Sequence, residues 1–256
     1  MKKVESAKKQ ISEFNRFTKV VTYDARLSTE NASAIIGSSE PNWDIVMDGS
    51  DNAATRYLIN DACVIHRKPL VSGSALQWEG QITVLNYLEG PCYRCLYPKP
   101  PPAYAVTNCS DGGVVGMVPG IIGQMQAVEI VKMILGVDKE NVLWRRMIFF
   151  DALAMKFRNV KLRDRNLKCV SCGPECDPKE KILSVESIDY ADFCQTKCNK
   201  YQLIKLPQEN TISVQKFYEL ISENPQNKML IDVRPPVQFG IVSTNQSSKI
   251  GQKIQA

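Results

Sequence analysis

Two Cys-x-x-Cys pairs, Cys92/Cys95 and Cys169/Cys172, are the strongest chemical signal in the sequence. Four thiolates satisfy the tetrahedral coordination of Zn²⁺, and a two-residue spacing lets both sulfurs of a pair reach one ion. Because four thiolates leave no open coordination position, we expect a structural zinc ion rather than a catalytic one. Two alternatives stay open at this stage: the pairs are unrelated, or Cys176 supplies the fourth sulfur in place of one of them.

A second candidate site is the segment DGSDN at residues 48–52, which directly follows an apolar run at 43–47. Ligands of open α/β sheets bind at the carboxyl ends of strands. A carboxylate at such a point, here Asp51, can hold Mg²⁺ on the phosphates of a nucleotide. A plain helix cap by Asp51 explains the same residues at least as well.

Two further residues have types suited to chemistry, Cys109 and Lys3. Cys109 lies in a proline-rich loop just before Gly112-Gly113 and a predicted helix, and a helix N-terminus lowers the pKa of a thiol. A small buried residue is the alternative reading of Cys109. Lys3 could stabilise phosphate charge, although other lysines of the same predicted helix compete with it for that role.

Hydrophobic periodicity predicts the elements that must position these residues. The predicted helices span residues 3–15, 28–36, 52–67, 116–135 and 213–223, and the predicted strands span 19–23, 43–48, 69–74, 80–86, 146–151, 156–162 and 229–234. Strands separated by helices indicate an α/β fold with a mostly parallel, doubly wound sheet and helices on both faces.

Composition limits the classes of protein that fit. The chain has 256 residues, 44% of them hydrophobic, which is enough for a sizeable core. A net charge of +5 is too mild to indicate nucleic-acid binding. No signal peptide or uninterrupted apolar span is present, so we expect a cytosolic protein with no membrane association. No Gly-x-Gly-x-x-Gly or Walker motif occurs, which argues against a self-sufficient dehydrogenase or P-loop enzyme.

Seven segments together resemble the E1-like adenylyltransferases, over about Lys3 to Cys172. They are KVESA (3–7), DGSDN (48–52), TRYLIND (55–61), PLVSGSA (69–75), EGQITV (79–84), GPCYRC (90–95) and TNCSDGGV (107–114). Within that family the chain most resembles the eukaryotic branch that joins adenylyltransferase and sulfurtransferase activities. The segment DVRPPVQF at 232–239 resembles the start of a rhodanese domain.

The resemblance implies a Rossmann-like fold and a reaction. The enzyme uses ATP to adenylate the C-terminal glycine of a ubiquitin-like sulfur-carrier protein, before thiocarboxylate formation for tRNA wobble-uridine thiolation and molybdenum cofactor synthesis. The implied partners are the molybdopterin synthase small subunit, the ubiquitin-related modifier, a cysteine desulfurase as sulfur donor and a second copy in a homodimer. The implied site residues are Lys3, Asp51 and Asn52 for Mg²⁺ and ATP, Cys109 for a thioester, and Cys92, Cys95, Cys169 and Cys172 for zinc.

The resemblance also implies a division of the chain and one departure from the family. Residues 1–175 match the adenylyltransferase domain, 176–210 a linker and 211–256 part of a rhodanese-like domain. The family's first strand and glycine-rich nucleotide loop precede the counterpart of Lys3 and are not in this chain. We therefore expect the chain alone to bind ATP poorly and to transfer no sulfur. The alternative function is a catalytically impaired, zinc-stabilised fragment that binds the modifier or dimerises without nucleotide chemistry.

Overall fold

The computed structural model describes residues 1–101, 112–194 and 212–223. Contacts divide the chain into two units, residues 1–198 and 199–256. The described part of the second unit contains helix α8 (Val214–Glu223), and Ser213 Oγ caps it by accepting a 3.2 Å hydrogen bond from Lys216 N. This confirms the predicted helix at 213–223, while the predicted strand at 229–234 lies outside the described residues.

The first unit is built on a five-stranded sheet with the order β1-β2-β3-β4-β5. The strands are β1 (Val46–Asp48), β2 (Leu70–Leu76), β3 (Glu79–Leu85), β4 (Arg146–Asp151) and β5 (Lys156–Lys161). Among the described strands only β1 and β2 run parallel, with Met47 opposite Val71. The three other pairs are antiparallel.

The expectation of a mostly parallel sheet is therefore wrong for the described strands. Two residues, Gln77 and Trp78, connect β2 to β3, and residues 152–155 connect β4 to β5. A parallel connection needs a crossover of a dozen or more residues, so these short links force antiparallel hairpins. The sequence lacks an Asn-Gly or Asp-Gly pair at Gln77, which adopts a left-handed φ of 52° without the usual turn residue.

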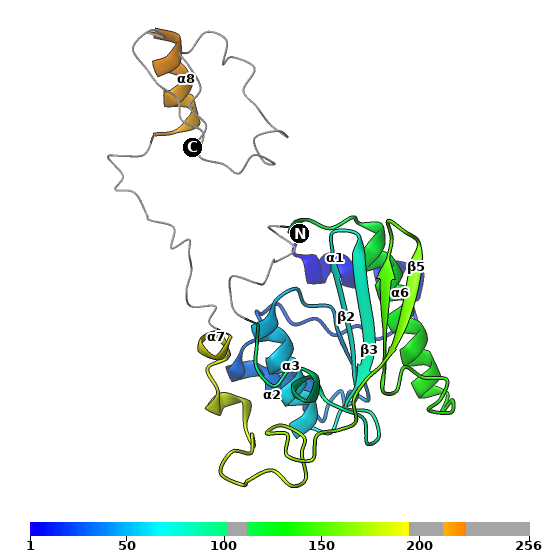
Figure 1. Ribbon diagram of the computed structural model, residues 1–256. Helices are drawn as coiled ribbons and strands as arrows, with labels where there is room; N and C mark the ends of the chain where they lie inside the picture. The colour runs from blue at the N-terminus through cyan, green and yellow to red at the C-terminus, as the bar shows by residue number, and fades with distance from the viewer. Residues whose placement is uncertain (102–111, 195–211, 224–256) are drawn as a thin grey trace. The chain divides into compact units, whose positions relative to one another are not determined.

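Helices cover both faces of the sheet, as predicted (Figure 1). Helices α2 (Thr29–Ile36) and α3 (Ala53–Ile65) lie on one face, and α6 (Met117–Ile134) lies on the other. Alternate strand residues supply the two cores because successive side chains of a strand point to opposite faces. Leu70, Leu85 and Met147 pack with α2 and α3, whereas Val71, Ile82 and Phe150 pack with Val118 and Ile122 of α6.

Part of the predicted linker packs into the core between the sheet and helices α2 and α3. The short 3₁₀ helix η2 (Val185–Ser187) and helix α7 (Tyr190–Phe193) contact α2 and α3. Val185, Tyr190 and Cys194 are buried there. The chain between 185 and 194 is thus part of the packed unit that contains the sheet.

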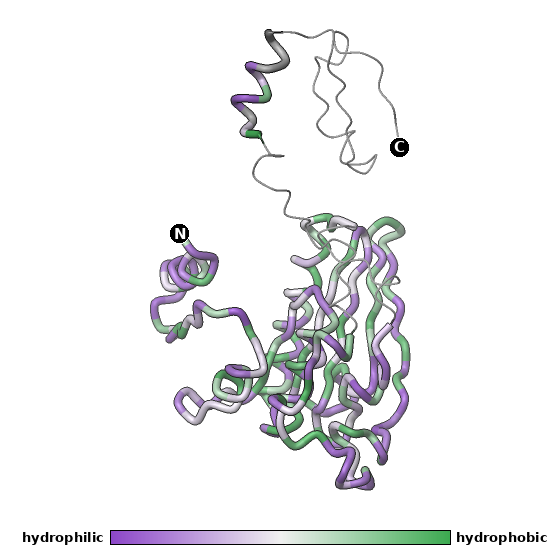
Figure 2. The backbone as a smooth tube through the Cα atoms, turned by 90° about the vertical axis from the view of Figure 1, so that its left-hand side faces the viewer, coloured by the Kyte–Doolittle hydropathy of each residue, from purple (hydrophilic) through white to green (hydrophobic). Residues whose placement is uncertain are grey.

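The N-terminal segment is largely exposed. Helix α1 (Lys3–Phe14) forms as predicted but has no buried residue, and Phe14 is 95% exposed. Figure 2 shows this helix standing clear of the sheet. The strand predicted at 19–23 is wrong, because the chain there is irregular and pairs with none of the described strands. Among the described helices none is long and apolar enough to cross a membrane.

A core substitution tests the packing between sheet and α6. Phe150 is 1% exposed and stacks on Phe157 with ring centroids 4.6 Å apart. Phe150→Ala should lower the free energy of unfolding by about 3–5 kcal/mol, because it leaves a cavity in a close-packed core. The control Met155→Ala, at an exposed hairpin position, should change it by less than about 0.5 kcal/mol. Chemical denaturation measures both, and equal effects would contradict this packing.

Candidate functional site

The loop after β1 presents a free carboxylate. Asp48 is 2% exposed, its Oδ1 accepts a 2.8 Å hydrogen bond from Ser50 N, and its Oδ2 accepts one of 3.4 Å from Ser72 Oγ. These bonds turn the chain so that Asp51 is exposed. Asn52, not Asp51, caps α3, since its Oδ1 accepts a 2.9 Å hydrogen bond from Thr55 N. Within the described chain Asp51 makes no hydrogen bond or ion pair, so its carboxylate is available to a ligand.

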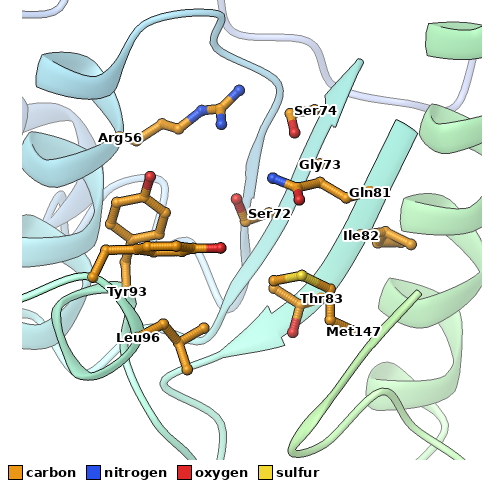
Figure 3. A pocket seen from close by; sticks show the side chains of 11 residues that line it. Arg56, Ser72, Gly73, Ser74, Gln81, Ile82, Thr83, Tyr93, Leu96 and Met147 are labelled. Atoms are coloured by element: carbon orange, nitrogen blue, oxygen red, sulfur yellow. The ribbon is translucent and has the colours of Figure 1, made fainter. Parts of the chain in front are cut away.

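A small hollow lies next to this loop, between α3, α4 (Tyr93–Leu96) and the strands β2 and β3 (Figure 3). Arg56 joins the two features, because its Nε and Nη2 donate to Ser50 O at 3.2 and 2.7 Å while its side chain lines the hollow. The polar lining consists of Arg56, Ser72, Ser74, Gln81, Thr83, Tyr93 and Tyr97. A guanidinium among hydroxyl and amide groups suits a carboxylate or an extended peptide backbone.

One wall of the hollow, α4, is held by hydrogen bonds from α3. Asn60 Oδ1 accepts from Tyr93 N at 2.7 Å, and the Tyr57 hydroxyl donates to Tyr97 O at 2.8 Å. The rings of Tyr57 and Tyr93 meet edge to face, with centroids 5.0 Å apart. The shape of the hollow therefore depends on how α3 and α4 pack against each other.

A buried ion pair between Asp61 and Arg94 locks the same two helices. Arg94 Nη2 lies 2.8 Å from Asp61 Oδ2, and its Nε donates to both carboxylate oxygens at 2.9 and 3.0 Å. The Tyr190 hydroxyl donates to Asp61 Oδ2 at 2.9 Å, and burial raises the pKa of Tyr190, so that it keeps this proton. The guanidinium also lies 4.6 Å from the ring centroid of Phe193. Both charges are thus fully paired in the core.

The four cysteines predicted as metal ligands come together next to this ion pair. Cys92, Cys95, Cys169 and Cys172 are all buried, and their sulfurs lie within 4.8 Å of one another. The Sγ–Sγ distances are 3.8 Å for Cys92–Cys95, 3.7 Å for Cys92–Cys169 and 3.3 Å for Cys95–Cys172. A tetrahedral zinc ion with Zn–S bonds of about 2.3 Å needs sulfurs about 3.8 Å apart, so the cluster fits a Cys₄ zinc site.

The protein around the cluster supports a metal. Asn166 N donates to Cys95 Sγ at 3.4 Å, and Arg165 donates to Cys172 O. Hydrogen bonds with the other three sulfurs, followed by burial, raise the pKa of Cys92, so a metal that binds here displaces a proton. The alternative ligand Cys176 lies outside the cluster and donates instead to Asp177 O.

Two other buried thiols lie outside the cluster. Burial raises the pKa of Cys194 to about 11 and also raises that of Cys63. Both stay protonated near neutral pH, which makes them packing residues rather than nucleophiles.

The remaining predicted site residues are not brought to the Asp51 loop by described contacts. Lys3 is the first residue of α1, is exposed, and makes no hydrogen bond or ion pair in the described part of the chain. Cys109 lies outside the described residues.

Sequence reasoning missed Arg56, Tyr93 and the Asp61–Arg94 pair. Asp61 carried a usable signal, because it lies four residues after Tyr57 on the buried side of α3. A carboxylate in an apolar helix stripe indicates a buried partner. The identity of that partner, 33 residues along the chain, carried no local signal.

Comparison with known proteins gives concordant matches. The model of the ThiF family matches residues 1–171. The adenylyltransferase and sulfurtransferase MOCS3 of Dictyostelium discoideum is 46% identical over 251 residues, which cover 97% of this chain and 56% of that protein. MOCS3 of Danio rerio is 45% identical over 252 residues, covering 97% of this chain and 52% of that protein. The chain spans about half the length of these curated relatives.

A structural comparison agrees on the fold. A crystal structure of Escherichia coli MccB with ATP superimposes with a TM-score of 0.54 at 16% identity, covering 67% of this chain and 50% of that one. MccB with its peptide MccA-N7isoASN also gives a TM-score of 0.54, at 14% identity, covering 66% of this chain and 51% of that one. At these identities the likeness concerns the fold alone.

The metal cluster predicts a zinc content that depends on particular thiols. The purified chain should carry one zinc ion for its four ligand sulfurs. Cys95→Ser should lose most of this zinc and several kcal/mol of unfolding free energy, because metal binding is coupled to folding. Cys176→Ser is the matched control and should keep both. Elemental analysis measures the zinc content, and chemical denaturation measures the free energy of unfolding. Zinc loss in Cys176→Ser but not in Cys95→Ser would contradict the assignment.

The buried ion pair predicts a large effect of a small change. Asp61→Asn leaves Arg94 without a counter-charge and should lower the free energy of unfolding by about 3–5 kcal/mol. The carboxylate of Asp164 is 73% exposed, so Asp164→Asn, which breaks its ion pair with Arg145, should cost no more than about 1 kcal/mol. Denaturant titrations of the two variants measure the difference, and similar values would argue against a structural role for Asp61.

Proposed function

The chain belongs to the ThiF family, and from this premise we propose that it adenylates the C-terminal glycine of a ubiquitin-like sulfur-carrier protein. The main support is the free Asp51 carboxylate beside an arginine-lined hollow, at the carboxyl end of β1. Its MOCS3 relatives are named as adenylyltransferases and sulfurtransferases, which agrees with this reaction.

In this proposal Asp51 holds Mg²⁺ on the phosphates of ATP. A free carboxylate at a strand end has the charge and the hard oxygen ligands that Mg²⁺ prefers. Asn52 caps α3 behind it, and Lys3 is assigned to phosphate charge by family resemblance. ATP is the nucleotide in the MccB crystal structure whose fold this chain shares, which supports the choice.

The hollow receives the tail of the carrier protein. A C-terminal Gly tail is narrow and ends in a carboxylate, and Arg56 offers the positive charge that such an end requires. One carboxylate oxygen attacks the α-phosphorus of ATP, a new P–O bond forms, and the bond to the β-phosphate oxygen breaks. The products are an acyl-adenylate and pyrophosphate. Arg56 donates a hydrogen bond to the Ser50 carbonyl, and Asp51 follows Ser50 in the chain. Both side chains therefore start close to the place where we put the attack on the α-phosphorus.

The later steps follow the family pattern and are proposed on that basis. Cys109 would attack the acyl-adenylate carbonyl, forming a thioester and releasing AMP. The terminal sulfur of a persulfide, supplied through a cysteine desulfurase and a rhodanese-like part of the protein, would attack the thioester carbonyl and release the Cys109 thiol. A thiol such as that of Cys109 would then attack the persulfide-derived S–S bond of the resulting acyl disulfide, which releases the thiocarboxylate and leaves a protein disulfide. The carriers are the molybdopterin synthase small subunit and the ubiquitin-related modifier, which serve molybdenum cofactor synthesis and tRNA wobble-uridine thiolation. A cytosolic homodimer is the form we propose.

Zinc has a structural part in this function. The Cys₄ cluster ties α4, which lines the hollow, to residues 169–172. When bound, zinc cross-links these segments, and the four thiolates leave it no position for substrate. The domain division proposed from the resemblance, 1–175, 176–210 and 211–256, places both the hollow and the cluster in the adenylyltransferase domain.

An ATP–pyrophosphate exchange assay tests the proposal. The chain with its carrier protein should show weak, carrier-dependent exchange of labelled pyrophosphate into ATP, in keeping with the poor ATP binding expected for the chain alone. Asp51→Ala should reduce this rate about a hundredfold, because a metal ligand stabilises transition-state charge by several kcal/mol. Asp44→Ala, an exposed carboxylate before β1, is the control and should leave the rate unchanged. A parent chain that shows no carrier-dependent exchange would contradict the proposal.

A further inference from the structure

Gln126 is a buried amide on the face of α6 that packs against the sheet. It lies on α6 one turn after Ile122, on the side that packs against β2, and is 3% exposed. Burying an amide in a core costs free energy unless its hydrogen bonds are made. Its Nε2 donates to Asp48 O at 2.8 Å and to Val71 O at 3.0 Å. The two donor hydrogens of one amide thus bind carbonyls of two adjacent strands.

These carbonyls belong to β1 and β2, at the edge of the described sheet where the Asp51 loop begins. Strand β1 has three residues and, among the described strands, pairs only with β2. Asp48 is its last residue, and the Asp51 loop follows directly. The Asp48 carboxylate is held by Ser50 N and Ser72 Oγ, while its carbonyl is held by Gln126. Both the carboxylate and the backbone carbonyl of Asp48, the residue before the loop, are therefore hydrogen-bonded.

The neighbouring backbone makes room for this amide. A Cβ atom on Gly73 would lie 2.5 Å from Gln126 Cδ and 2.6 Å from its Oε1, closer than non-bonded atoms approach. The side chain therefore reaches across β2 where that strand carries no side chain on this face. The amide occupies a space that would be too small with any other residue at position 73.

We propose that Gln126 is a positioning residue for the nucleotide site. Through the Asp48 carbonyl it sets where the 49–52 loop stands relative to β2 and to the hollow, and so where Asp51 presents its carboxylate to Mg²⁺. This inference rests on the proposed function for its effect on nucleotide, but not for its effect on the loop. The simpler reading is an amide that only satisfies two buried carbonyls and stabilises the whole sheet.

The test compares Gln126→Met, which keeps the shape but has no donors, with the control Gln124→Met on the exposed side of the same helix. Amide hydrogen exchange in the intact chain should become about tenfold faster at residues 49–52 in Gln126→Met, since two hydrogen bonds are lost, and should not change in the control. Exchange in β3 and β4 should stay as in the parent. Equal rates at 49–52 in parent and Gln126→Met would overturn the proposal, as would faster exchange throughout the sheet.

A double-mutant cycle separates positioning from general stability. The dissociation constant of Mg²⁺–ATP should rise about tenfold in Gln126→Met, but less than twofold when the same change is made in Asp51→Ala, because the effect passes through Asp51. Equal increases in both backgrounds would show a merely structural role. If Gln126→Met fails to fold, Gln126→Asn, which keeps an amide one methylene too short, replaces it in both measurements.

The two measurements distinguish the inference from the proposed function. A parent chain that does not bind Mg²⁺–ATP removes the nucleotide function, yet the exchange rates at 49–52 still decide whether Gln126 holds the loop. Nucleotide binding by the parent with unchanged exchange in Gln126→Met keeps the function and rejects the role of Gln126.

Discussion

The ion pair between Asp61 and Arg94 is the constraint on which the arrangement of the site depends. Removing two charges from water costs several kcal/mol for each ion, and a single weak contact would not recover it. Here the recovery comes from three charged hydrogen bonds, a tyrosine hydroxyl and the faces of two aromatic rings. These partners come from α3, α4 and α7, so satisfying one buried charge specifies how three separate segments pack.

Helix α3 carries this constraint to the rest of the site. Its N-terminal cap Asn52 follows Asp51, its first turns hold Arg56 and Tyr57, and its middle holds Asn60 and Asp61. In an α-helix, residues three or four apart share a face, so Arg56, Asn60 and Tyr57, Asp61 are neighbours along the side that meets α4. One rigid helix thereby relates the strand-end carboxylate, the polar hollow and the cysteine cluster. The zinc site and the hollow are linked through α4, whose residues contribute to both.

Much of the local structure was predictable, for reasons that particular elements show. The apolar run at 117–134 predicts α6 because it is too long for a strand and is interrupted by too many polar residues for a membrane span. The segment at 19–23 has strand-like residues but no strand beside it, and a strand needs a partner for its hydrogen bonds. The sheet was expected to be mostly parallel, but the two-residue link at Gln77-Trp78 excludes that arrangement between β2 and β3.

The sequence alone identified the family by resemblance and four of its cysteines as a metal site, because Cys-x-x-Cys spacing is a local property that needs no knowledge of the fold. It also marked the Asp51 loop, since a strand followed by polar residues is visible in a single segment. Only the tertiary structure decided that Cys172 rather than Cys176 completes the cluster, that Asn52 caps α3 and leaves Asp51 free, and that Arg94 pairs with Asp61. Gln126 belongs to the same group, as its two acceptors lie 78 and 55 residues away. These choices depend on atoms brought together across long stretches of chain, where burial removes water as the alternative partner and polar groups must pair with the protein groups around them.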